Sequence, residues 1–175
     1  MTEDKLNLQN RLNFATWVQN ILKNNNQYSP PINVFNIANN EGIDLKYLPK
    51  RKISERGIEG ELSYLNRKKQ WAIYFNGNNT TTRQRFTVAH ELGHYYIDEH
   101  RRALRTQSVR RHQSYCSFES NRLIEREADL FATCLLMPPY RFAQEVESAP
   151  EGLDGVLDLK ESFGTSVTST AIRYA

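Results

Sequence analysis

The stretch of the chain that says most about its fold is His90-Glu91-Leu92-Gly93-His94, an H-E-x-x-H pattern inside a predicted amphipathic helix. In a helix, the four-residue spacing places both imidazoles on one face about one turn apart, which is the reach needed to hold one metal ion. Glu91 is then held close enough to take a proton from a water molecule at that metal. The spacing therefore predicts two metal ligands, His90 and His94, and a general base, Glu91. The alternative is a helix with two solvated histidines.

A third ligand is expected in the next long helix, which is predicted from about residue 121 to residue 137. Catalytic zinc sites usually combine two histidines with one further ligand and keep a position for water. Glu125 and Glu127 compete for this role, but at about 100° per residue Glu127 lies about 200° away from Glu125. Glu125 shares its face with two alanines and with Asp129, one turn further on. We therefore select Glu125 as the ligand and Asp129 as the acceptor of a hydrogen bond from the non-metal nitrogen of a ligating histidine.

The composition is that of a globular protein with a real core. Of the 175 residues, 39% are hydrophobic and 25% are charged, with a formal net charge of +3. This length fits one domain, or one domain with a small appendage, and the charge is too small to indicate a nucleic-acid-binding protein by itself. The sequence contains no apolar run long enough for a transmembrane helix, its N-terminus is polar, and its two cysteines lack a disulfide spacing. We expect a reducing, cytoplasmic setting and no membrane partner.

Periodicity and turn residues divide the chain into elements. Helices are expected at residues 8–23, from an entry at Pro31 to an end at Gly42, at residues 121–137 and 140–148, and in the H-E-x-x-H segment after a threonine run at 80–82. Strands are expected at residues 43–48 and in a hairpin of residues 61–65 and 71–75. Residues 100–120 lack periodicity, which predicts a loop or a short helix. Residues 152–175 are typical of two short helices around a glycine turn, the outline of a helix-turn-helix.

Two segments carry a family resemblance. Residues 82–96, which contain the H-E-x-x-H pattern, resemble the signature segment of the ImmA/IrrE metallo-endopeptidases. Residues 125–132, followed by Leu-Leu-Met-Pro at 135–138, resemble the second signature of that family. The resemblance covers most of residues 30–175. It implies a cytoplasmic, gluzincin-like enzyme encoded by bacteria or their mobile elements, with ligands at His90, His94 and Glu125 and with Glu91 catalytic.

The expected fold is α+β. A mostly helical, zincin-like metallopeptidase domain with a small antiparallel β-sheet is expected at residues 1–150, followed by a small helix-turn-helix-like segment at residues 151–175. Some members of the resembling family continue into a further C-terminal domain. Because the chain stops at Ala175 inside a predicted helix, we expect a short member or a truncated one.

The predicted function is that of a zinc-dependent endopeptidase, with Mn²⁺ as a substitute in vitro. Several members of the resembling family cleave helix-turn-helix repressors and so switch genes on, which implies such a repressor as the protein substrate and gene regulation as the outcome. The alternative is a non-catalytic regulatory module that contacts a repressor or DNA through its C-terminal helices. DNA contact is the less expected of these partners. We further hypothesise that an edge strand near residues 71–75 holds an extended peptide by strand addition.

Several chemically capable residues receive weaker interpretations. His100 and His112 lack partners at ligand spacing, so both are expected to be solvated. Cys134 lies on the far side of its helix from Glu125 and is expected to be a packed thiol, whereas Cys116 is a less favoured candidate for an inhibitory fourth ligand. An oxyanion-stabilising side chain is expected but none is selected among the candidates Tyr95, Tyr96, Tyr140 and Arg141.

Arginines are concentrated directly after the H-E-x-x-H helix. The five that lie between Glu99 and His112 are Arg101, Arg102, Arg105, Arg110 and Arg111. A charge run of this kind usually forms a solvated face, which is the favoured interpretation. The alternative is a docking surface for an acidic protein segment or for DNA phosphates.

Overall fold

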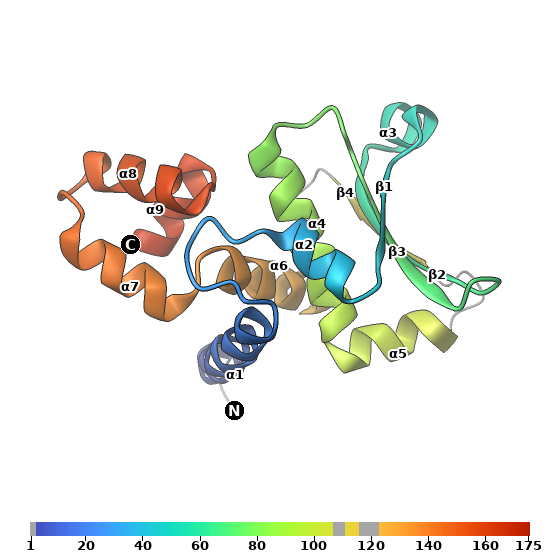
Figure 1. Ribbon diagram of the computed structural model, residues 1–175, viewed down its shortest axis with the longest axis horizontal. Coiled ribbons are helices and arrows are strands. Elements are labelled where there is room, and N and C mark those ends of the chain that lie inside the picture. The colour runs from blue at the N-terminus through green and yellow to red at the C-terminus, as the bar shows by residue number, and fades with distance from the viewer. Residues whose placement is uncertain (1–2, 107–110, 116–122) are drawn as a thin grey trace. The chain divides into compact units, whose positions relative to one another are not determined.

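The computed structural model describes residues 3–106, 111–115 and 123–175 (Figure 1). The helices are α1 (Glu3–Asn24), α2 (Val34–Asn40), α3 (Lys50–Arg56), α4 (Thr81–Tyr96), α5 (Asp98–Thr106), α6 (Leu123–Leu136), α7 (Pro139–Ser148), α8 (Leu153–Phe163) and α9 (Val167–Tyr174). The strands are β1 (Asp44–Tyr47), β2 (Ile58–Leu65), β3 (Gln70–Phe75) and β4 (Arg111–Tyr115). This helix-rich arrangement with one small sheet confirms the predicted α+β class.

The chain forms two compact units. One unit is Val34–Asp129, and the other combines Met1–Asn33 with Leu130–Ala175. We call the first the sheet unit and the second the helical unit. The division expected from the sequence, at residue 150, stays a prediction.

The sheet unit is built around four strands in the order β1-β3-β2-β4. The predicted hairpin is confirmed, because β2 and β3 pair antiparallel with Leu62 opposite Ile73. β1 adds to β3 in parallel and β4 adds to β2 antiparallel, so the sheet is mixed and not wholly antiparallel as expected. β1 and β4 are therefore the edge strands of the described sheet.

The hypothesis that residues 71–75 form an edge strand is wrong. These residues belong to β3, which is bonded to β1 on one side and to β2 on the other. Sequence alternation identifies a hairpin but not the strands that pair with its outer edges. Any peptide that adds to this sheet must add to β1 or β4.

Helix α4 is the central helix of the sheet unit. Its N-cap is Thr80, whose side chain accepts a hydrogen bond from the Arg83 backbone N–H. α4 packs against β2 and β3 and also contacts α2 and α5 (Figure 1). Val88, Ala89 and Leu92 are fully buried. A helix held on several sides in this way is a rigid support for the histidines on it.

Two elements of the sheet unit were not predicted. α3 contains a single aliphatic residue, Ile53, and so has no apolar periodicity; it ends at Gly57, whose φ of 60° is the left-handed C-cap conformation. The segment expected to be a loop or short helix contains α5 and, after four residues outside the description, the strand β4. β4 reads Arg-His-Gln-Ser-Tyr, which has no apolar alternation to reveal it.

A buried acid lies on β2. Glu61 is 3% exposed and forms an ion pair with Lys52 of α3. Its carboxylate also accepts hydrogen bonds of 2.8 Å from Ser63 and from Gln113 of β4. Burial raises the pKa of Glu61, but these hydrogen bonds outweigh burial and hold its pKa below the ordinary value. As a charged group, Glu61 therefore attaches α3 to the sheet and adds a side-chain contact between β2 and β4.

The helical unit has its own core. The buried residues of this core are Met137, Phe142, Leu159 and Phe163. α8 ends at Gly164, whose φ of 60° allows the turn into α9, as the predicted glycine turn requires. No helix among the described residues is long and apolar enough to cross a membrane.

Candidate metal centre

Three predicted ligand side chains converge between α4 and α6. The Nε2 atoms of His90 and His94 are 3.1 Å apart. Glu125 Oε2 lies 3.4 Å from His90 Nε2 and 3.8 Å from His94 Nε2. All three residues are buried, with exposed fractions of 8% or less. The two long helices therefore bring two imidazole nitrogens and one carboxylate oxygen to one point.

These distances fit a tetrahedral metal ion. With metal–ligand bonds of about 2.0–2.2 Å, two ligand atoms of a tetrahedron are about 3.3–3.6 Å apart. The three observed distances of 3.1, 3.4 and 3.8 Å bracket that range. Two imidazoles and a carboxylate are a donor set that suits zinc.

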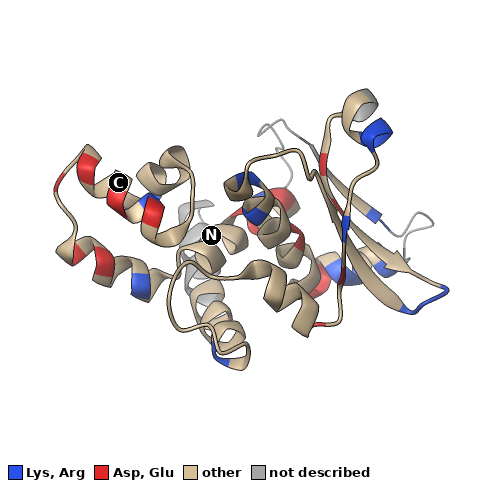
Figure 2. Ribbon diagram, turned by 45° about the horizontal axis from the view of Figure 1, so that its top comes forward, with Lys and Arg blue, Asp and Glu red and all other residues tan. Residues whose placement is uncertain are grey.

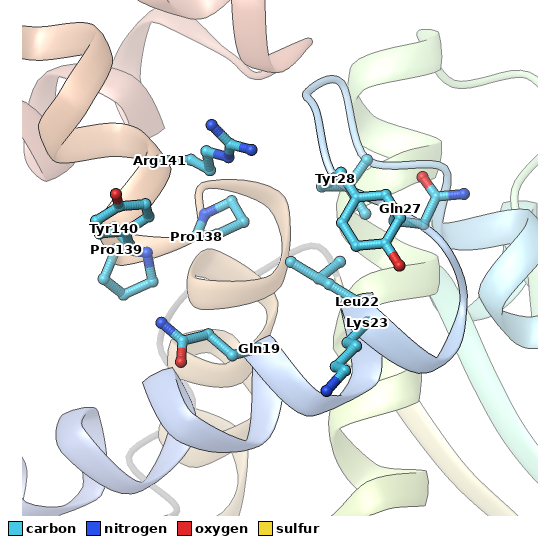
Figure 3. Close-up of a pocket in the computed structure, with 10 residues that line it drawn as sticks. Gln19, Leu22, Lys23, Gln27, Tyr28, Pro138, Pro139, Tyr140 and Arg141 are labelled. Carbon is cyan, nitrogen blue, oxygen red and sulfur yellow. The ribbon is translucent and has the colours of Figure 1, made fainter.

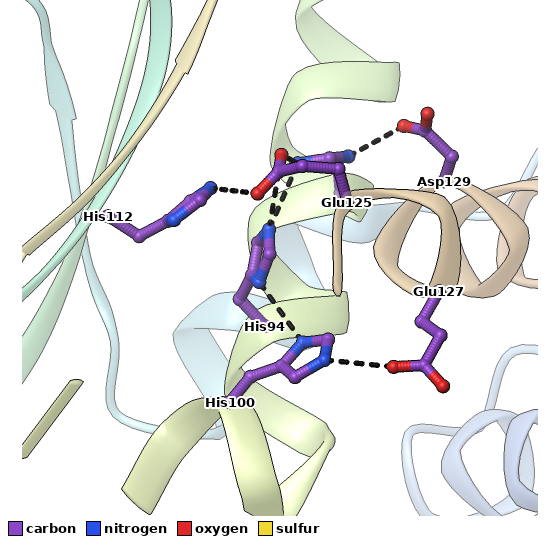
Figure 4. Close-up of polar contacts among 7 residues, drawn as sticks. His94, His100, His112, Glu125, Glu127 and Asp129 are labelled. Atoms are coloured by element: carbon purple, nitrogen blue, oxygen red, sulfur yellow. Dashed lines mark hydrogen bonds and ion pairs between the residues drawn. The ribbon is translucent and has the colours of Figure 1, made fainter. Parts of the chain in front are cut away.

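His112 joins this cluster, so the expectation that it is solvated is wrong. Its Nε2 lies 3.0 Å from Glu125 Oε1, and its donor atom lies within 4.8 Å of those of His90, His94 and Glu125 (Figure 4). Its ring stacks on that of His94, with 3.9 Å between ring centres. The His112 Nε2 atom is buried, with Glu125 as its ion-pair partner. Helix spacing does not predict the position of His112, because β4 reaches the site through its pairing with β2.

Asp129 lies on the outer side of His90. Its Oδ1 is 2.8 Å from His90 Nδ1, the ring nitrogen that faces away from His94 and Glu125. Burial lowers the pKa of His90, but hydrogen bonds to Asp129 and Glu125 outweigh burial and raise the pKa to about 10. The surroundings of His90 therefore favour positive charge at this position.

A second outer contact lies beside His94. His94 Nδ1 is 3.1 Å from His100 Nδ1, and His100 Nε2 is 3.1 Å from Glu127 Oε2 (Figure 4). His100 is 5% exposed, so the expectation that it is solvated is also wrong. Glu127, which the helical wheel separates from Glu125, contacts His100 and is not in the cluster of ligand atoms.

The electrostatic balance of the centre suits a cation. Burial raises the pKa of Glu125, but hydrogen bonds with His112, His90 and His94 outweigh it and hold the carboxyl well below its usual range. Burial lowers the pKa of His94 to about 3, so its ring stays neutral and able to bind a metal. Glu91, which is fully buried, adds a second carboxyl group to the core. A divalent ion would offset the negative charge that these carboxylates bring into the core.

Glu91 is buried against β2. Its exposed fraction is 0%. A Cβ atom placed on Gly60 of β2 would lie 2.6 Å from Glu91 Oε1 and 2.6 Å from Thr87 Cγ2. The carboxylate therefore approaches the strand backbone closely, and only glycine at position 60 leaves room for it.

Two of the oxyanion candidates point elsewhere. The hydroxyls of Tyr95 and Tyr96 both donate to the carboxylate of Glu41, at 3.3 and 2.9 Å. Burial and this carboxylate together raise the pKa of Tyr96 above its ordinary value. Both phenols are therefore engaged by Glu41, just after the C-terminal end of α2.

The other two oxyanion candidates, Tyr140 and Arg141, belong to the helical unit. They help to line a largely apolar groove of about 330 Å³ (Figure 3). Its other lining residues are Gln19, Leu22, Lys23, Gln27, Tyr28, Ile32, Pro138 and Pro139. The groove contains two cationic side chains but no carboxylate, imidazole or thiol. It therefore lacks the groups for acid–base chemistry.

Two of the clustered arginines pack on aromatic rings of the sheet unit. The Arg101 guanidinium lies 5.4 Å from the centre of the Tyr95 ring, and that of Arg105 lies 5.1 Å from the Tyr64 ring. Each is a cation–π contact. Arg110 lies outside the described residues. Docking of a partner on this segment stays a prediction.

Cys134 is not among the residues of the described centre. Cys134 is 1% exposed and reduced, as the prediction of a packed thiol requires. Cys116 lies outside the described residues.

A comparison with known protein families gives a match that spans the residues of this centre. The profile of the IrrE N-terminal-like domain, a metallopeptidase family, matches residues 38–174. That span contains the hairpin, both helices of the centre and the C-terminal helix pair. No protein of curated function matches the sequence. The chain belongs to the IrrE N-terminal-like domain family and is a metallopeptidase of the IrrE/ImmA kind.

Proposed function

We propose that the chain is a zinc-dependent endopeptidase that cuts a protein substrate. In this proposal His90, His94 and Glu125 hold the ion, Glu91 is the general base and Asp129 orients His90. The observation that carries the proposal is the convergence of two Nε2 atoms and one carboxylate oxygen at 3.1, 3.4 and 3.8 Å. These are distances at which one tetrahedral ion can bind all three.

The chemistry divides between the ion and the protein. When bound, zinc supplies Lewis acidity, which lowers the pKa of a water molecule to about 7 and polarises the scissile carbonyl. The Glu91 carboxylate accepts the proton of the attacking water and passes it to the nitrogen of the leaving amine. Because Glu91 is fully buried and close to Gly60, its carboxylate has little freedom to leave this position.

His112 is proposed to act on the substrate. In this proposal His112 Nε2, which is buried in the cluster and pairs with Glu125 Oε1 at 3.0 Å, donates to the carbonyl oxygen of the substrate as charge develops there. β4 is an edge strand, to which an extended peptide can add by backbone hydrogen bonds. One strand would then both align the peptide and supply the donor.

The proposed substrate is a helix-turn-helix transcriptional repressor, because resemblance to the ImmA/IrrE enzymes implies it. Binding of DNA by the C-terminal helices is less favoured. Residues 151–175 contain four acidic residues and only two basic ones. Acidic side chains recur on α7 and α8 (Figure 2), where they would repel phosphates. One of the two bases, Arg173, lies over the ring of Phe142.

The test compares the wild-type chain with Glu91→Gln. Each protein is loaded with zinc or manganese and incubated with the repressor encoded by the neighbouring gene, and new peptide termini are identified by mass spectrometry. Wild type is expected to cut, whereas Glu91→Gln is expected to bind the metal equally well and to lose about 10²–10⁴-fold in rate. Glu147→Gln, which removes an exposed carboxylate from α7, is the matched control and should cut at the wild-type rate.

The outcomes separate the two functional classes. Cleavage by Glu91→Gln at the wild-type rate would show that Glu91 is not the base. A wild-type protein that binds zinc, cuts nothing and still binds the repressor would instead support the non-catalytic regulatory module.

A further inference from the structure

We propose that His100 and Glu127 are positioning residues that fix the ring and the tautomer of His94, a role that rests on the proposed metal-binding function. The contacts form a chain from one ligand to a carboxylate: His94 Nδ1 to His100 Nδ1 at 3.1 Å, then His100 Nε2 to Glu127 Oε2 at 3.1 Å. This series of side-chain contacts links α4 to α5 and α5 to α6 (Figure 4).

The direction of every hydrogen bond in this chain follows from one requirement. If His94 binds a metal through Nε2, that nitrogen carries no proton, and the neutral ring must carry its proton on Nδ1. His94 Nδ1–H must then donate to His100 Nδ1, which has to be the acceptor. The proton of neutral His100 is therefore on Nε2, where it donates to the carboxylate of Glu127. The three groups are compatible with only one arrangement of their protons.

Because the two imidazoles are buried, they cannot exchange these hydrogen bonds for bonds to bulk water. His94 is 1% exposed and His100 is 5% exposed. Because a buried ring nitrogen without a partner is unfavourable, neither imidazole can turn away from this contact without losing a hydrogen bond. Glu127 lies nearer the surface, with a side chain that is 23% exposed. The chain therefore connects the most buried ligand to a carboxylate close to solvent.

A break in the helix brings His100 to His94. On an uninterrupted helix, residues six apart lie about 240° around the axis from one another and cannot touch. α4 ends at Tyr96, and Ile97 has an extended backbone with φ −71° and ψ 110° before α5 begins at Asp98. This single extended residue redirects α5 so that its third residue faces back towards α4.

The two ligand histidines thus have unequal support. His90 contacts a carboxylate directly, because Asp129 Oδ1 lies 2.8 Å from its Nδ1. His94 reaches its carboxylate only through a second imidazole. Removal of the carboxylate that contacts a metal-binding histidine typically lowers metal affinity about 10–100-fold. We expect a loss of metal affinity in the same range when the contact between His100 and His94 is removed.

The test measures zinc affinity by competition with a chromogenic chelator, with no substrate present. His100→Leu keeps the bulk of the side chain but removes the acceptor, and it should weaken zinc binding about 10–100-fold. Glu127→Gln should weaken it less, because its amide oxygen can still accept from His100. His100→Asn is the rescue variant, since an Asn side-chain oxygen can stand in for Nδ1, and it should recover most of the affinity.

Two controls separate positioning from stability. Leu104→Val removes a methylene from a 5% exposed core residue of α5, and Glu99→Gln removes an exposed carboxylate beside His100. Both should bind zinc as wild type does. If Leu104→Val weakens zinc binding as much as His100→Leu does, His100 acts through folding and the proposal is overturned. If wild type itself binds no zinc, it is the proposed metalloenzyme function that fails.

A spectroscopic measurement tests the proton arrangement directly. In the zinc-loaded protein, long-range ¹H–¹⁵N spectra should show His94 protonated on Nδ1 and His100 protonated on Nε2. A proton on Nδ1 of His100 would contradict the proposal, because the 3.1 Å contact between the two Nδ1 atoms would then hold two donors.

Discussion

A single added methyl group at Gly60 should test the position of the proposed base. In Gly60→Ala the new Cβ would lie 2.6 Å from Glu91 Oε1 and from Thr87 Cγ2, whereas ordinary contact begins at 3.4 Å. The shortfall is 3.4 − 2.6 = 0.8 Å on both atoms. Thr87 cannot easily rotate away, because its hydroxyl donates to the Arg83 carbonyl at 3.0 Å. The new methyl group must therefore displace the buried carboxylate of Glu91 from its observed position.

We expect Gly60→Ala to lower the rate of cleavage but to change zinc affinity little. Displacement of a catalytic group by about 1 Å can cost about 10²-fold, so kcat/KM for repressor cleavage should fall by about that factor. Overpacking should lower the free energy of unfolding by about 1–3 kcal/mol. Zinc affinity should stay within a few-fold of wild type, because the three atoms nearest the new methyl group belong to Glu91 and Thr87 and not to a candidate ligand.

Gly77→Ala provides the matched control for this prediction. Its Cβ would also meet an atom at 2.6 Å, but that atom is on the ring of Tyr47, which is 71% exposed and can swing into solvent. This variant should cut at the wild-type rate. A folded Gly60→Ala protein with wild-type kcat/KM would refute the reasoning, since Glu91 would then not need its observed position.

Three further predictions follow from the same contacts. His112→Ala should lower kcat about 10²–10³-fold with zinc affinity nearly unchanged, whereas a loss of zinc binding would make His112 a fourth ligand. Glu61→Gln should destabilise the protein by about 2 kcal/mol near neutral pH in chemical denaturation. Because the folded pKa of Glu61 lies below its unfolded value of about 4.5, the difference from wild type should be full above that pH and vanish as pH falls through the folded pKa. Chelation of zinc present at 100 times its Kd should lower stability by about 2.7 kcal/mol, and an unchanged melting curve would argue against a bound ion.

The parts of the fold that the sequence predicted are those governed by local spacing. Apolar periodicity identified α4 and α6, and the turn between residues 66 and 70 identified the hairpin. The choice of Glu125 over Glu127 used only the angle per residue within one helix, and Glu125 is the one in the cluster. Each of these inferences compares residues in a single element or in adjacent strands, where the backbone fixes the geometry.

The parts that were missed depend on contacts between elements. β4 has no apolar alternation, and its pairing with β2 joins residues about 50 positions apart, as in the pairing of Glu61 with Gln113. His112 comes to the centre only through that pairing. His100 comes to it only through the extended residue Ile97, which no propensity singles out. Spacing along the sequence therefore does not show that either histidine lies beside the H-E-x-x-H histidines.

This difference has a physical meaning for the centre itself. The H-E-x-x-H spacing fixes which nitrogens can meet at a metal, because both Nε2 atoms project from one helix. It does not fix the other side of each ring, where a neutral imidazole must place its proton. That side is set by Asp129 for His90 and by His100 for His94, and both partners come from other helices. A sequence with the motif alone therefore specifies the ligands but not their tautomers. In the proposal made above, both histidines take the tautomer that binds the ion only when α5 and α6 pack against α4.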